Sequence, residues 1–164
     1  MTLDLGSIQR LHAVKNSAYG NAWKRRGELL GIFTNLARKV DRLEHLARHE
    51  VEVNDESRHD TLVDLLVYGL KYQSYLLDEA PALRPALLPS AGSGDRISDD
   101  PKWFDQLLQR WPQQYEPDQC PSSLTATLDS LQAAIEEHAP ATRRLQLAQA
   151  LTAWAWHALG GDQT

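Results

Sequence analysis

Apolar residues recur every three or four positions along most of the chain, which is the repeat of an amphipathic α-helix. Between residues 28 and 49 this repeat forms one continuous stripe: Leu29, Phe33, Leu36, Val40, Leu43 and Ala47. No stretch shows the strict alternation of apolar and polar residues that is typical of a half-buried strand. The pattern therefore predicts an all-α protein, a helical bundle.

Breaks in the pattern divide the chain into successive helices. The predicted helices cover residues 4–17, 28–49, 57–79, 102–111, 120–139 and 141–160. Prolines after residue 80 end the third helix, and a loop is expected over residues 81–100. A length of 164 residues suits one domain, 1–164. We expect residues 1–80 to form its core and residues 101–164 to form helices for packing or oligomerisation.

Composition narrows the possible partners and the compartment. The net charge of −5 argues against binding to a nucleic-acid backbone. A single cysteine, Cys120, excludes an internal disulfide and favours a reducing compartment. No apolar run is long enough to cross a membrane, and the first residues do not resemble a signal peptide. We therefore expect a cytoplasmic protein, or one of the host cytoplasm if a phage encodes it.

Two acidic pairs supply the best candidate chemistry. Asp41 and Glu44 are three residues apart, and Asp60 and Asp64 are four apart, so each pair shares one face of its predicted helix. A short connection makes these helices antiparallel neighbours, which would bring the pairs to the same level. Four carboxylates there can hold Mg²⁺ or Mn²⁺. The competing interpretation is an ordinary salt-bridged surface with the nearby arginines.

The face that carries Asp64 continues with Tyr68 and Lys71. A carboxylate, a phenol and an ammonium in this order suit a metal-bound phosphate followed by contacts to a base. Eleven of the seventeen Lys and Arg residues fall between Arg10 and Lys71, in the same part of the chain as the acidic pairs. This mixture suits a metal-bound polyphosphate and, equally, a salt-bridged helical surface.

The acidic pairs resemble the ExxE and ExxD motifs of the all-α NTP pyrophosphohydrolases, the MazG-like and dimeric-dUTPase superfamily. Asp41-Arg-Leu-Glu44 stands in for ExxE, and Asp64 matches the final Asp of ExxD. Thr61 occupies the position of the second Glu, so Asp60 is the expected substitute. The resemblance implies a metal-binding antiparallel helix hairpin within the bundle.

A longer match, over residues 12–78, resembles the phage-type nucleotide-modification-associated MazG-like group. It rests on Lys15-Asn16-x-x-Tyr19-Gly20-x-x-Trp23, Arg26-Gly27-Glu28, Gly31-Ile32-Phe33 and ARKVDRLE. The resemblance implies conversion of a (d)NTP to the monophosphate and pyrophosphate, with dGTP or dATP as the expected substrate. It also implies a homo-oligomer, a dimer or tetramer.

Within this resemblance each candidate residue has an expected role. The metal ligands are Asp41, Glu44, Asp60 and Asp64, and the catalytic set is Asp41, Glu44, Asp64 and Lys71, with Glu44 orienting the attacking water. The substrate contacts are Asn16, Tyr19, Trp23, Arg25, Arg26, Tyr68 and Lys71. Glu28 lies about 140° around the helix from Asp41, so it is expected away from the metal face.

A second hypothesis belongs to another class of protein. The chain can be a noncatalytic helical interaction or accessory protein whose apolar C-terminal half binds a partner. In that case the four acids belong to exposed salt bridges, and metal changes nothing.

Overall fold

The computed structural model describes residues 3–49 and 55–163. Seven α-helices are found there, and no strand occurs within these residues. They are α1 (Leu5–Tyr19), α2 (Thr34–Arg48), α3 (Asp55–Glu79), α4 (Arg84–Leu87), α5 (Pro101–Gln114), α6 (Leu124–Glu136) and α7 (Ala141–Ala158). The prediction of an all-α protein is confirmed.

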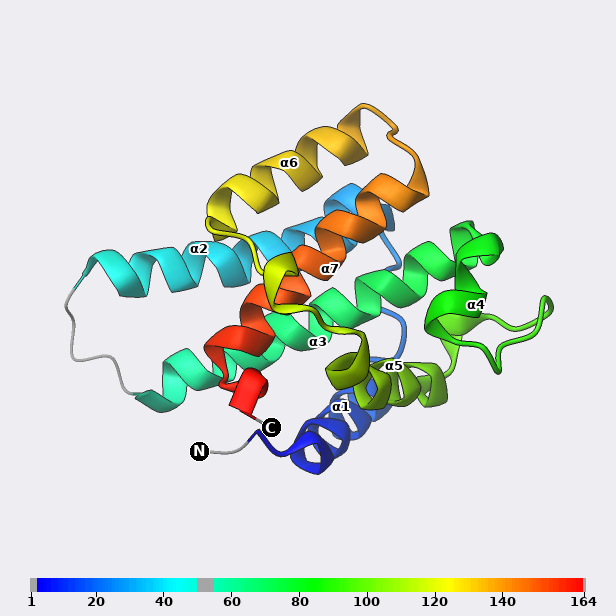
Figure 1. The fold of residues 1–164 in the computed structure, drawn as a ribbon, viewed down its shortest axis with the longest axis horizontal. Coiled ribbons are helices and arrows are strands. Elements are labelled where there is room, and N and C mark those ends of the chain that lie inside the picture. Colours follow the sequence, from blue (N-terminus) through cyan, green and yellow to red (C-terminus); the bar gives the residue numbers. More distant parts are fainter. Residues whose placement is uncertain (1–2, 50–54, 164) are drawn as a thin grey trace.

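α3 is the central helix of the molecule (Figure 1). It contacts α1, α2, α5 and α7, and its side chains are buried on nearly every side from Leu62 to Leu77. α2 and α6 lie on one side of it, and α1 and α5 lie on the other (Figure 1). This position explains why the sequence of α3 lacks a simple two-sided pattern.

The C-terminal helices complete the core of the chain itself. α7 packs along α3, and Trp156 on α7 is 1% exposed. α6 covers both α2 and α7. The apolar residues that the sequence offered as an interface are therefore largely used inside the molecule.

The contact between α3 and α7 is unusually close at Gly69. A Cβ atom added there would lie 2.4 Å from the hydroxyl oxygen of Thr152. That hydroxyl donates to the carbonyl of Ala148 at 2.7 Å and accepts from the fully buried Gln73 amide at 3.0 Å. Gly69 thus leaves room for the Thr152 side chain and its hydrogen bonds.

In two segments the structure differs from the predicted elements. The helix expected over residues 28–49 begins with a π-helical segment, Glu28–Phe33, before α2. The loop expected over residues 81–100 contains α4 and two 3₁₀ turns, Pro81–Leu83 and Ile97–Asp99. None of the described helices is long and apolar enough to cross a membrane.

Candidate functional site

The four predicted metal ligands do not meet. Asp41 is exposed on α2. Glu44 accepts a hydrogen bond from Thr125 of α6 at 2.6 Å and pairs with Arg48 at 3.2 Å. Asp60 is exposed and borders an apolar groove beside α1. Only Asp64 enters a polar pocket.

Within residues 3–49 and 55–163, no three His, Cys, Asp or Glu side chains are grouped so that they could hold a metal ion. The physical reason lies in how the helices are rotated about their axes. α2 turns Glu44 toward α6, whereas α3 turns Asp64 toward α1. An antiparallel hairpin brings two helices side by side but does not decide which faces meet.

Asp64 lies instead between two lysines. It accepts a hydrogen bond from Lys15 of α1 at 2.9 Å and from Lys39 of α2 at 2.7 Å. Burial alone would raise the pKa of Asp64, but these two ammonium groups outweigh it and hold the pKa below its ordinary value. Asp64 is therefore a carboxylate that ties three helices together.

A pocket of about 460 Å³ opens beside this cluster, between α1, α2, α3 and the turn of residues 20–27. We call it the lysine pocket. Its lining includes five of the residues predicted from the sequence: Tyr19, Trp23, Asp64, Tyr68 and Lys71. The structure adds His12, Lys15, Asn35 and Lys39 to them. Three lysines and one carboxylate leave the pocket positively charged, in a chain whose net charge is −5.

Lys71 is the most unusual group in the lysine pocket. The residue is 9% exposed, and its ammonium lies 5.3 Å from the ring centroid of Trp23 and 5.6 Å from that of Tyr68. No carboxylate among the described residues forms an ion pair with it. Burial, and after it the charge of Lys15, lowers the pKa of Lys71 to about 8. The charge of Asp64 offsets only part of this effect. A buried ammonium without an ion-pair partner is costly, so Lys71 is a candidate contact for an anionic or accepting ligand.

His12 lies next to Lys71 on the inner wall. It is 3% exposed and stacks on Phe104 of α5, with ring centroids 3.7 Å apart. Its Nδ1 atom is buried and has no hydrogen-bond partner among the described residues. Burial, helped by the charge of Lys71, lowers the pKa of His12 to about 4. The imidazole is therefore neutral at physiological pH, and one of its polar atoms is unsatisfied.

Folding stability should fall in acid because of His12. The unfolded chain binds this proton near pH 6.5, whereas the folded chain binds it near pH 4, so acid favours unfolding across that interval. The contribution lost is up to about 3 kcal/mol. Urea unfolding at a series of pH values measures it. The His12→Phe variant, which keeps the stacking on Phe104, should show a shallower decline, and an identical decline would contradict this assignment.

The remaining predicted substrate contacts lie elsewhere. Arg26 is exposed, and Arg25 lines a different cavity. Asn16 borders a very small cavity on the far side of His12, Trp23 and Lys71. Of these three, Asn16 alone is near the lysine pocket, and it lies behind its wall.

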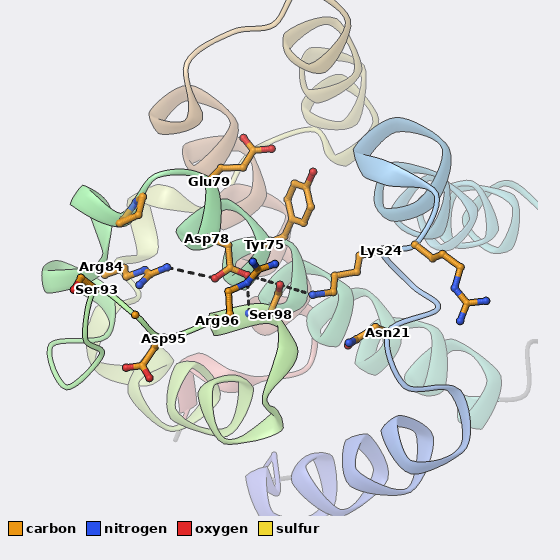
Figure 2. Close-up of a pocket in the computed structure, with 13 residues that line it drawn as sticks. Asn21, Lys24, Tyr75, Asp78, Glu79, Arg84, Ser93, Asp95, Arg96 and Ser98 are labelled. Atoms are coloured by element: carbon orange, nitrogen blue, oxygen red, sulfur yellow. Dashed lines mark hydrogen bonds and ion pairs between the residues drawn. The ribbon is translucent and has the colours of Figure 1, made fainter.

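The cavity that Arg25 lines is the larger one, about 630 Å³, and Figure 2 shows its interior. Asp78 at its base accepts hydrogen bonds from the backbone of Ile97 at 2.6 Å and Ser98 at 3.0 Å, and pairs with Arg84. Lys24 donates to Ser98 at 2.7 Å. Asp78 is thus paired with Arg84, and Lys24 with Asp99, so these groups hold the loop of residues 91–98 in place.

Glu28 also has protein partners. Its carboxylate binds Arg144 of α7 at 2.6 and 2.7 Å and accepts a hydrogen bond from the hydroxyl of Tyr72. Arg144 continues to Glu79 at 2.8 Å. This network joins the π-helical segment to α3 and α7, and Glu28 does not line the lysine pocket.

Comparison with known proteins gives one partial relationship. No family model matches the chain, and no solved structure matches it. The Gene 30 protein of Bacillus phage SP01 is 30% identical over 91 residues, covering 42% of this chain and 40% of the phage protein. The chain is therefore similar, over less than half of its length, to part of a phage protein.

Proposed function

We propose that this protein binds a nucleoside phosphate in the lysine pocket. The observation that carries the proposal is Lys71, a buried ammonium without an ion-pair partner among the described residues. An anionic or strongly accepting ligand removes the cost of leaving that charge unpaired. Trp23 and Tyr68 beside it offer the aromatic faces on which a base stacks.

The size and charge of the pocket support the same ligand class. Its volume of about 460 Å³ falls in the range of roughly 300–1,000 Å³ that is usual for small-molecule sites. Lys15 and Lys39 stand at its mouth, with side chains 47% and 26% exposed. Ammonium groups in such a position can bind phosphate oxygens that remain partly hydrated.

The donor set does not fit a metal ion held by the protein alone. The pocket offers one carboxylate, Asp64, which two lysines already bind. Conversion of a (d)NTP to the monophosphate and pyrophosphate is thus the second candidate, and it rests on the resemblance over residues 12–78. In that candidate Mg²⁺ or Mn²⁺ would enter with the triphosphate, whose oxygens supply most of the coordination.

Replacing Asp64 with Asn separates the two candidates. Asp64 competes with a ligand for Lys15 and Lys39, so Asp64→Asn should bind dGTP roughly threefold to fivefold more tightly in EDTA. Titration calorimetry at low salt measures this change. Asp129→Asn, at an exposed site on α6 outside the pocket, is the matched control and should leave the affinity unchanged.

The same two variants test for turnover. With Mg²⁺ or Mn²⁺, the hydrolase candidate predicts pyrophosphate release by wild type and Asp129→Asn, and a loss of about 100-fold or more in Asp64→Asn. Binding without any product supports a binding protein and rejects hydrolysis. If no nucleoside phosphate binds at all, the lysine pocket has another role. That result would favour the hypothesis of a noncatalytic interaction protein.

A further inference from the structure

The lysine pocket has two chemically different ends. At the open end, Lys15 and Lys39 surround Asp64 within reach of solvent. At the closed end, Lys71 is 9% exposed and lies over the rings of Trp23 and Tyr68, and His12, which lines the same pocket, is 3% exposed. A phosphate chain keeps more of its hydration at the open end, whereas a base gains most from leaving water at the aromatic end. This division orients a nucleotide with its base inward.

Lys71 presents only donors to a ligand that reaches the closed end. An ammonium group carries three N–H donors and no acceptor. The ring faces of Trp23 and Tyr68 attract the positive charge of the Lys71 ammonium, but unlike a carboxylate they offer no lone pair to accept a hydrogen bond from it. A ligand oxygen at this position would accept from Lys71, whereas a ligand amino group would place two sets of donors against each other in a buried site.

We propose that the lysine pocket selects nucleotides whose base carries an oxo group at purine C6 or pyrimidine C4, namely guanine, hypoxanthine, thymine or uracil, over adenine and cytosine, which carry an amino group at that position. Lys71 donates to that oxygen, as lysine does to guanine in nucleic-acid recognition. His12 borders the same end and remains neutral, so it adds no second positive charge there. This inference rests on the proposed function, and it names the substrate class of the same site.

A matched pair of ligands tests the inference with the wild-type protein alone. dITP and dATP share their sugar, triphosphate and ring skeleton, and they differ in the 6-oxo group with its neighbouring N–H against the 6-amino group. We expect dITP to bind about 10- to 100-fold more tightly, and dUTP to be preferred over dCTP in the same way. Titration calorimetry in EDTA at neutral pH measures both ratios without any turnover.

A substitution then assigns the preference to one residue. A glutamine amide offers a donor and an acceptor, so Lys71→Gln should bind dITP and dATP within about threefold of each other. Its affinity for dITP should stay within about tenfold of wild type, since the glutamine amide still donates to the oxo group and the lysines at the open end remain. Lys102→Gln, an exposed lysine on α5 outside the pocket, should keep the wild-type ratio.

The outcomes are distinguishable. Equal binding of dITP and dATP by wild type overturns the base selection and leaves nucleotide binding intact. A ratio that survives Lys71→Gln overturns the role of Lys71. Failure of all four nucleotides to bind overturns the selection together with the proposed function.

Discussion

Replacing Lys71 with methionine is expected to abolish tight binding of dGTP and, at the same time, to make the protein more stable. Methionine keeps the length and apolar stem of lysine but removes the charge that burial disfavours. The pKa of Lys71 falls from 10.5 to about 8, which corresponds to a penalty of up to about 3 kcal/mol for the charged form. Removing it should raise the melting temperature by roughly 5–10 °C, whereas affinity should fall about 100-fold.

The experiment is decisive because stability and affinity for dGTP are expected to change in opposite directions. If Lys71 only filled space, its replacement would lower stability without changing the affinity for dGTP. If Lys71 only kept the site folded, its replacement would lower stability and affinity together. Differential scanning fluorimetry and titration calorimetry on one preparation provide the two measurements. Lys102→Met removes an exposed charge on α5 and should change neither quantity. A destabilised Lys71→Met protein that binds dGTP normally would refute the assignment.

The second large effect is expected at Gly69, on the opposite side of α3. In Gly69→Ala the new methyl group meets the Thr152 hydroxyl at 2.4 Å and the Thr152 Cα at 3.4 Å, so either the Thr152 side chain gives up its buried hydrogen bonds or the contact between α3 and α7 shifts. Overpacking of this kind costs about 1–3 kcal/mol and occasionally more, against a gain of roughly 1 kcal/mol from better helix propensity. We expect a net loss of about 2 kcal/mol in the free energy of unfolding, measured with urea.

Gly94→Ala is the matched control for this prediction. Gly94 is exposed, and a Cβ added there meets nothing within 4 Å, so stability should hardly change. In the double variant Gly69→Ala/Thr152→Ala the closest clash disappears. The combined loss should therefore be smaller than the sum of the single losses. Strict additivity would show that the contact between Gly69 and Thr152 is not the cause.

The helical architecture was predictable because it depends on local spacing. The stripe from Leu36 to Leu43 is buried as expected, and α1 and α7 begin within a residue of their predicted starts. The π-helical segment at Glu28–Phe33 was not predictable from apolar periodicity, because its partners, Arg144 and Tyr72, are distant in sequence.

The site was predictable where it follows one helix and unpredictable where helices meet. Asp64, Tyr68 and Lys71 line one pocket because their spacing on α3 gives them a common face. Lys15 and Lys39 reach Asp64 from 49 and 25 residues away, and only the tertiary fold determines such pairings. Glu44 fails to join them because Thr125, far along the chain, binds it on another side.

The missing side chain at Gly69 also has a consequence for the ligand site, two residues away from Lys71 on the same helix. α3 packs closely against α7 at this point. The lack of a side chain at Gly69 therefore helps to set the distance between the two helices. Any residue that lifts α3 here would shift the inner wall of the pocket relative to α1 and α2. Under the proposed function, a substitution at Gly69 would therefore change nucleotide affinity from the face of α3 opposite the lysine pocket.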